Sequence, residues 1–264
     1  MEKYKAENGV VFLRSELLRG IRHGFSTRLG GVSTLPHTAS MNLAFGRGDG
    51  GNIVLHNLEM FCSALDIAPE TTVSLPQVHS DDVIYVNDTM RGTGYYSDSQ
   101  KSCDGYVTDF PNIALGVKIA DCVPILLADR EAGVIAAIHA GWRGTAMEIA
   151  ARGIDMMLSL GARRENIYAA IGPAIGACCF EIGEEVAAQL CGVSASGHIK
   201  PSPANDGKCF ADLPGMNKSA LKLSGIPDKN IDTCNLCTCC NSQLFHSHRK
   251  TDGKRGTMLA LISL

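Results

Sequence analysis

The sequence lacks long hydrophobic runs, an excess of charge of one sign and an apolar leader. Its longest apolar stretches, such as Val134 to Ile138, are far shorter than the roughly 18 residues of a membrane span. With 24 basic and 27 acidic residues the formal net charge is −3, so no basic field is present to hold nucleic acid or an anionic membrane. Because Met1 to Val10 carry early charges and no apolar segment, we expect no secretory signal and a cytoplasmic protein.

The sequence also lacks the cysteine pattern of a small disulfide scaffold, although it contains 11 cysteines in 264 residues. The count is odd, and the 45% apolar content is enough for a sizeable core without cross-links. Cys234-x-x-Cys237-x-Cys239-Cys240 looks like half of a zinc ribbon, but no second CxxC pair completes it. We therefore expect reduced, partly buried thiols here. Cys178-Cys179 could complete a site only if the fold brought it close.

The pattern of apolar residues predicts a single α+β domain over residues 1–264, layered and with mixed sheets. Several strands follow one another without helices between them, which argues against a doubly wound sheet. Helical spacing predicts three helices: one burying Val54 to Leu65, one burying Met147 to Met157, and one capped by Asp212 that buries Met216, Ala220 and Leu223. The predicted strands are Val10–Leu13, Arg22–Thr27, Val83–Val86, Ile113–Lys118, Ile125–Ala128, Val134–Ile138, Ile167–Ile171 and Thr257–Ile262.

The segment from Val134 to Gly144 predicts a buried strand, a glycine turn and a helix that starts near Thr145. His139 lies at the end of the strand, and the backbone N–H groups of such a turn can bind an anion. Arg143 would add a guanidinium for phosphate or carboxylate. The alternative is a buried Trp142 beside a solvated Arg143. A second glycine-rich segment, Gly46 to Gly51, fits GxGxxG, but we interpret it as a turn that opens a helix.

Cys122 and His79 also lie beside predicted strands, in Ala120-Asp-Cys-Val-Pro124 and Pro76-Gln-Val-His79. One cysteine and two histidines suit Zn²⁺, and three protein ligands leave a fourth position open, as in catalytic zinc sites. Taken singly, His79 and Cys122 fit a structural role better, and spacing alone does not bring them together. The H-x-E and P-C-x-x-C signature of the cytidine deaminases is absent.

Together these segments resemble the laccase-domain family, whose members have been described as polyphenol oxidases, peptidoglycan-editing factors and purine nucleoside phosphorylases. The likeness runs in order from about His23 to the C-terminus. The motifs that carry it are His23-Gly-Phe-Ser-Thr-Arg28, Asn42-Leu, Gly48-Asp49, Gln77-Val-His79, Cys103-Asp-Gly, Ala120-Asp-Cys122-x-Pro, His139-Ala-Gly-Trp-Arg-Gly144, Ile171-Gly-Pro-x-Ile-Gly-x-Cys178, Asp212-Leu and Ser247-x-Arg249.

The resemblance implies a layered α+β sandwich with outer helices and an open zinc site formed by His79, Cys122 and His139, in which copper is an alternative metal. It further implies phosphorolysis of adenosine, inosine, guanosine and 5′-methylthioadenosine, with adenosine deamination as a companion activity. Purine nucleosides and phosphate are then the partners, without nucleic acid or membrane. We expect Cys122 and Arg143 to take part in catalysis. The expected substrate-binding residues are Arg28, Asn42 and Arg249.

Three other functions compete with this interpretation. A copper-loaded site could oxidise phenols, although eight histidines with a single H-x-H motif cannot build the copper centres of a blue multicopper oxidase. Cys122 activated by His139 could instead be the nucleophile of a hydrolase or amidase that acts on peptidoglycan precursors. A non-enzymatic metal-binding protein is the remaining alternative, and an open three-ligand site argues against it.

Overall fold

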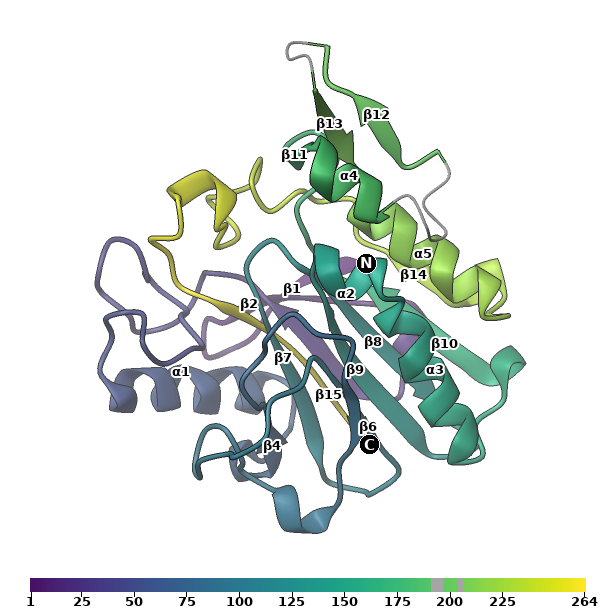
Figure 1. Ribbon diagram of the computed structural model, residues 1–264. Helices are drawn as coiled ribbons and strands as arrows, with labels where there is room; N and C mark the ends of the chain where they lie inside the picture. Colours follow the sequence, from purple (N-terminus) through teal and green to yellow (C-terminus); the bar gives the residue numbers. More distant parts are fainter. Residues whose placement is uncertain (191–196, 204–206) are drawn as a thin grey trace.

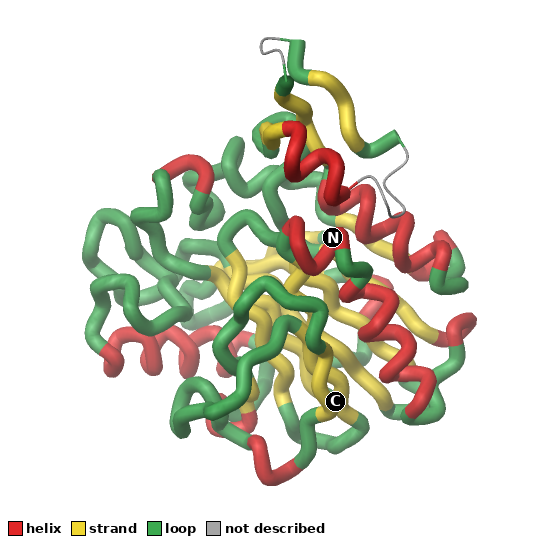
Figure 2. The backbone as a smooth tube through the Cα atoms, in the orientation of Figure 1, coloured by secondary structure: helices red, strands yellow, loops and turns green. Residues whose placement is uncertain are grey.

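Two six-stranded β-sheets stack against each other at the centre of the molecule, and helices cover their outer faces (Figure 1). The computed structural model describes residues 1–190, 197–203 and 207–264. Figure 2 shows the strands gathered in the middle with the helices around them. Among the described residues, no helix combines the length and the apolar character needed to cross a membrane.

The first sheet mixes antiparallel pairs with one parallel pair, between β4 and β7. It brings the C-terminal strand between two strands from much earlier in the sequence. Its strands, in order across the sheet, are β1 (Glu2–Lys5), β2 (Val11–Arg14), β3 (Arg22–Ser26), β15 (Met258–Ser263), β7 (Ala114–Ile119) and β4 (Thr72–Val73).

The second sheet is also mixed, and its long central strands β8 and β9 form an antiparallel hairpin in which Pro124 is paired with His139. Parallel pairs close both of its edges. Its strands, in order, are β14 (Ile231–Thr233), β10 (Ile167–Ile171), β8 (Val123–Asp129), β9 (Val134–Ala140), β6 (Gly105–Thr108) and β5 (Val83–Tyr85).

The central strands are buried on both faces, which explains why they read as continuous apolar runs rather than alternating ones. Along β8, Leu126 and Ala128 face the core between the two sheets, whereas Ile125 and Leu127 face the outer helices. Each of these side chains is fully buried. Truncating a large one to alanine typically costs about 2–5 kcal/mol of stability.

Helix α1 (Gly51–Ala64) covers the first sheet, and α3 (Ile149–Ser159) and α5 (Leu213–Leu223) cover the second. The expected capping of α5 is confirmed, because the Asp212 carboxylate accepts a hydrogen bond from the Gly215 N–H at 3.0 Å. The segment Gly46 to Gly51 is, as expected, a turn that opens a helix. The described residues form two shorter α-helices as well, α2 (Trp142–Ala146) and α4 (Glu184–Leu190).

Two expected core residues are exposed. Met147 is 39% exposed because Glu148 adopts a left-handed backbone conformation, with φ of 59°, that separates α2 from α3. Leu223 is 76% exposed, since α5 ends there and Ile226 folds back to take the buried place. The Ile226 N–H donates to the Leu221 carbonyl at 3.1 Å, and Gly225 supplies the left-handed turn that this requires.

The stretch 194–207 is rich in Ser, Pro, Gly and Asn, which predicts a surface loop, and it lies partly outside the described residues. The part that is described includes β12 (Ile199–Pro201), which pairs with β13 (Lys208–Ala211). Together with β11 (Glu181–Gly183) these strands form a third, three-stranded sheet that projects from the sandwich beside α4 (Figure 1). The layered α+β architecture expected from the sequence is confirmed.

Candidate metal centre

Three side chains of the expected metal site lie together at one end of the β8–β9 hairpin. Cys122 immediately precedes β8, and His139 is the next-to-last residue of β9. The loop before β5 brings in His79, whose Nε2 lies 3.8 Å from the Cys122 Sγ. One nitrogen or sulfur ligand atom from each of the three lies within 4.8 Å of the others. We call these three residues the triad.

Asp104, which directly precedes β6, is the residue that orients the triad. It is fully buried, and its Oδ1 accepts a hydrogen bond from the His139 Nδ1 at 2.8 Å. Because an ionised carboxylate only accepts, Nδ1 must carry the proton, which leaves the Nε2 lone pair available to a metal. The same carboxylate accepts backbone N–H bonds from Val78, His79 and Ser80 at 3.1, 3.1 and 2.7 Å.

Left-handed backbone conformations position two members of the triad. His79 has φ of 61°, and Asp121, which precedes Cys122, has φ of 90°. Such conformations cost of order 1–3 kcal/mol in residues other than glycine, so the surroundings must hold them. The Asp104 carboxylate holds the backbone of His79 by accepting its N–H. The backbone of Asp121 is held by its own carboxylate, which accepts from the Thr238 hydroxyl at 2.6 Å and the Arg249 N–H at 2.7 Å.

Gly141 allows the triad to close up. A Cβ atom there would lie 2.8 Å from the His79 Cδ2 and 3.3 Å from the Cys122 Sγ, so a larger residue would displace both ligands. It is also the N-cap residue of α2, which therefore begins at Trp142 rather than near Thr145 as expected. The glycine of this turn serves the packing of the triad.

The side chains of the triad and Asp104 form an electrostatically coupled group. Burial alone would raise the pKa of the Cys122 thiol, but the charge and hydrogen bonds of His139 and His79 outweigh it and lower that pKa to about 6. Burial would lower the pKa of His139, but Cys122 and Asp104 outweigh it and raise the pKa to about 9. Without a metal ion, the chain thus favours a thiolate beside an imidazolium. The same environment suits a cation held by a thiolate and two neutral imidazoles.

All three triad residues line a cavity of about 870 Å³. This volume is within the range of about 300–1,000 Å³ that is usual for small-molecule sites. Four cationic side chains, one histidine and two phenylalanines line the same cavity: Arg47, Lys118, Arg249, Arg255, His248, Phe45 and Phe180. The cavity can therefore accommodate an anionic group and a flat ring next to the triad.

The predicted site residues outside the triad differ in whether they line the cavity. Arg249 lines the cavity, while its guanidinium donates to the carbonyls of Cys179 and Glu181 at 2.9 and 3.1 Å. Arg143 is exposed and stacks over the Trp142 ring at 4.2 Å, and neither residue is among those that line the cavity in the described chain.

Arg28 and Asn42 also lie outside that lining and hold loops by hydrogen bonds. The Arg28 guanidinium donates to the carbonyls of Ala39 and Ser242. The buried Asn42 side chain bonds both the N–H and the carbonyl of Ala44, which does line the cavity. Asn42 thus acts on the cavity through the backbone of Ala44, whereas the Arg28 guanidinium holds two loops outside the lining.

Sequence reasoning did not single out Lys118 and Arg255, two cations that line the cavity. The Lys118 ammonium donates to the Ser74 carbonyl at 2.9 Å, and burial lowers its pKa to about 8. The Nε of Arg255 is buried without a hydrogen-bond partner among the described residues. A charged residue within an otherwise apolar strand was the available signal for Lys118. Arg255 carried no signal beyond its place in the basic segment that also contains Arg249, Lys250 and Lys254.

Comparison with known proteins shows which family the chain is similar to. A family model described as multi-copper polyphenol oxidoreductase laccase matches residues 22–264. A protein of Deinococcus radiodurans named purine nucleoside phosphorylase is 37% identical over 256 residues, which cover 97% of this chain and 94% of that protein. Adenosine deaminase RL5, from an unknown prokaryotic organism, is 34% identical over 86% of this chain and 87% of its own length. The crystal structure of YlmD from Geobacillus stearothermophilus superposes with a TM-score of 0.90 at 32% identity, covering 99% of this chain and 98% of that one.

Proposed function

The chain belongs to the family described as multi-copper polyphenol oxidoreductase laccase, and on that premise we propose that it is a purine nucleoside phosphorylase with adenosine deaminase activity. The substrates that we propose are adenosine, inosine, guanosine and 5′-methylthioadenosine, together with phosphate. Relatives named for these two activities, at 37% and 34% identity, support the assignment. The observation that carries it is the triad, which opens onto a cavity lined with cations and aromatic rings.

The donor set of the triad fits zinc. His79, Cys122 and His139 would hold the ion, and Asp104 would orient His139 through the carboxylate–histidine bond common in zinc enzymes. Three protein ligands leave one position for water or substrate on the cavity side. When bound, zinc would supply Lewis acidity that makes water a better nucleophile or polarises a substrate oxygen.

The cations of the cavity would bind phosphate, and its rings would bind the purine. Lys118, Arg255 and Arg47 supply positive charge, and the free Nε–H of Arg255 offers a donor to a phosphate oxygen. Phe180 and Phe45 offer flat apolar faces to a base. We propose that Arg249 positions Phe180, since its guanidinium lies 5.4 Å from the centre of that ring.

Both reactions follow from substrates bound in this way. In phosphorolysis a phosphate oxygen bonds to C1′ of the ribose and the bond from C1′ to the purine nitrogen breaks. The electron pair of that bond and a proton end on the released base. In deamination, water adds at C6 of adenosine and ammonia leaves, which gives inosine. His139, whose Nδ1–H is fixed on Asp104, and the Cys122 sulfur would remain ligands throughout.

Product analysis tests the proposal. Zinc-loaded protein is incubated with adenosine, with and without phosphate, and the products are separated by chromatography. We expect adenine and ribose 1-phosphate only with phosphate, and inosine with or without it. If neither product forms above a denatured control, the proposal fails.

A copper-dependent polyphenol oxidase is the second candidate, because imidazole and thiolate ligands also bind copper and copper binds such sites more tightly than zinc. Copper-loaded protein that oxidises a phenolic substrate while failing to cleave adenosine would favour it. A third candidate uses the Cys122 thiolate as a nucleophile, which its pKa of about 6 favours in the metal-free chain. Thiol alkylation that abolishes amide hydrolysis by the metal-free protein would favour that one.

A further inference from the structure

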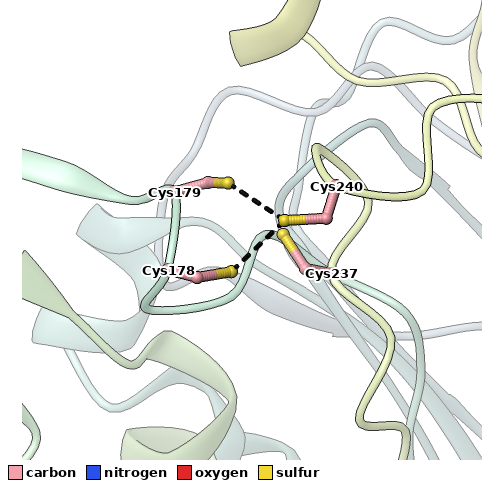
Figure 3. Close-up of side chains that lie close together, drawn as sticks. All are labelled: Cys178, Cys179, Cys237 and Cys240. Carbon is pink, nitrogen blue, oxygen red and sulfur yellow. Dashed lines mark hydrogen bonds between the residues drawn. The ribbon is translucent and has the colours of Figure 1, made fainter.

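Four cysteines outside the cavity come together from two loops that are far apart in the sequence. Cys178 and Cys179 follow β10, whereas Cys237 and Cys240 follow β14. Because β10 and β14 are parallel neighbours, their C-terminal ends deliver both loops to the same edge of the sheet. Figure 3 shows the four side chains pointing toward one another. The fold thus brings the Cys178-Cys179 pair to the cysteine-rich segment, and we call these four residues the cysteine cluster.

The spacing of the four sulfurs suits a single metal ion. The Cys240 Sγ lies 3.5 Å from that of Cys178 and 3.4 Å from that of Cys179, and all four sulfurs lie within 4.8 Å of one another. Tetrahedral zinc with Zn–S bonds of about 2.3 Å puts its sulfur ligands about 3.8 Å apart. The two separations from Cys240 are 0.3–0.4 Å shorter than this value, and no pair is farther apart than 4.8 Å. Four sulfurs around one point are what a tetrathiolate site requires.

The backbone around the cysteine cluster is arranged to stabilise a thiolate. The Gly176 N–H donates to the Cys237 Sγ at 3.2 Å. A Cβ at Gly176 would lie only 3.3 Å from the Cys237 Cβ and 3.4 Å from the Cys178 Sγ, so the glycine permits this close approach. Cys178 and Cys240 are exposed, which gives an ion access from solvent.

We propose that Cys178, Cys179, Cys237 and Cys240 bind one zinc ion as a structural tetrathiolate site, separate from the triad. Four protein ligands leave no position open for substrate, so the role is to fix the two loops. The loops matter to the cavity. Ile175 lines it and donates its N–H to the Asp121 carbonyl at 2.9 Å, and Thr238 donates to the Asp121 carboxylate that precedes Cys122.

A disulfide is the competing chemistry. A bond from Cys240 to either Cys178 or Cys179 would use two of the four thiols, release two hydrogen atoms and need an external oxidant. It would give no role to Cys237, whose sulfur accepts the Gly176 N–H. The convergence of all four sulfurs favours metal binding, and the experiment separates the two outcomes.

Zinc content of the purified, dialysed protein tests the proposal. We expect two zinc ions per chain in the wild type, one in Cys178→Ser/Cys240→Ser and one in Cys122→Ala. Cys239→Ser is the matched control, because Cys239 lies in the same turn but outside the cluster of four, and it should keep both ions. Two ions in Cys178→Ser/Cys240→Ser, or one ion in Cys239→Ser, would overturn the ligand assignment.

Cobalt replacement covers the case in which the double variant fails to fold. Cobalt-loaded Cys122→Ala should keep strong thiolate-to-cobalt charge-transfer absorption, because four thiolates remain, and losing that absorption would overturn the proposal. An intact mass lower by two hydrogen atoms, with one zinc ion bound only at the triad, would show a disulfide instead. A wild type with only one zinc ion, which Cys122→Ala keeps and Cys178→Ser/Cys240→Ser loses, would support the cysteine cluster while contradicting a metal at the triad, so the two proposals fail separately.

Discussion

Replacing Asp104 with asparagine tests how the triad is organised. The carboxylate accepts five hydrogen bonds: two on Oδ1, from His79 and His139, and three on Oδ2, from Val78 and the N–H and hydroxyl of Ser80. An asparagine amide can accept on one side only. Whichever way it is turned, its NH₂ group faces at least two donors.

The size of the effect follows from these bonds. Each buried donor left without an acceptor costs about 1–3 kcal/mol, so the free energy of unfolding should fall by about 2–6 kcal/mol. Losing the carboxylate partner of a metal-binding histidine typically weakens metal affinity about 10–100-fold. We therefore expect zinc affinity at the triad to fall by that factor in Asp104→Asn.

The assay combines zinc competition against a chromogenic chelator with unfolding in urea. Asp129→Asn is the matched control, since Asp129 is also fully buried and accepts backbone N–H bonds from Glu131, Ala132 and Arg163. It lies at the opposite end of β8 from Cys122. The control should lose stability and keep its zinc affinity. Folded Asp104→Asn with wild-type zinc affinity would refute the reasoning.

Three further predictions concern the ligands, the phosphate site and acid stability. Cys122→Ala should lose the zinc ion of the triad and adenosine turnover together; retained zinc with lost turnover would favour the nucleophile alternative. Arg255→Ala should raise the KM for phosphate about 10–100-fold, the value of one charge-assisted hydrogen bond, while Arg143→Ala should change it less. A larger rise in the KM for phosphate in Arg143→Ala than in Arg255→Ala would place the phosphate at the glycine turn that carries Arg143. Burial lowers the pKa of His246 from 6.5 to about 3. As the pH falls below about 6.5, His246 is therefore protonated in the unfolded chain but not in the folded one, and the free energy of unfolding decreases. In His246→Phe, the free energy of unfolding, measured with urea, should therefore fall by about 1.4 kcal/mol less per pH unit between pH 6 and 4 than in the wild type. The same pH dependence in both proteins would contradict a neutral buried His246.

Strands that are buried on both faces could be predicted from the sequence, because short apolar runs between turn signals favour strands over helices. All eight predicted strands overlap with observed ones, for example Val134–Ile138 with β9. Strands without such a signal were missed. β6 (Gly105–Thr108) is fully buried but has only four residues, one of them glycine. β1 (Glu2–Lys5) is a charged strand at the edge of its sheet.

The members of the triad could be named from the sequence, but their meeting could not be derived from it. Cys122 and His139 meet because β8 and β9 pair as a hairpin, which is a local event. His79 arrives from 43 residues before Cys122, on a loop held by Gln77, whose side chain bonds the backbone of Lys118 in both directions. Such a long-range contact leaves no periodicity in the sequence. Only the likeness to a known family indicated it.

The cysteine cluster and the position of Arg143 could not be derived from the sequence either. Cys178 and Cys240 are 62 residues apart and meet only because β10 and β14 are neighbours in the sheet. Arg143 attracted attention because it lies in a glycine turn beside His139, yet its guanidinium stacks on Trp142 at the surface. The direction of a side chain depends on packing that local sequence does not encode.

Zinc add-back tests most directly the claim that the triad holds the metal needed for nucleoside cleavage. Protein stripped with a chelator is titrated with zinc, and phosphate-dependent release of adenine from adenosine is measured against the zinc bound, with Cys122→Ala as the reference. We predict that stripped wild-type protein is inactive, that activity returns as zinc binds, and that Cys122→Ala stays inactive at every zinc level. Full activity in the stripped protein, or recovery in Cys122→Ala, would contradict the assignment.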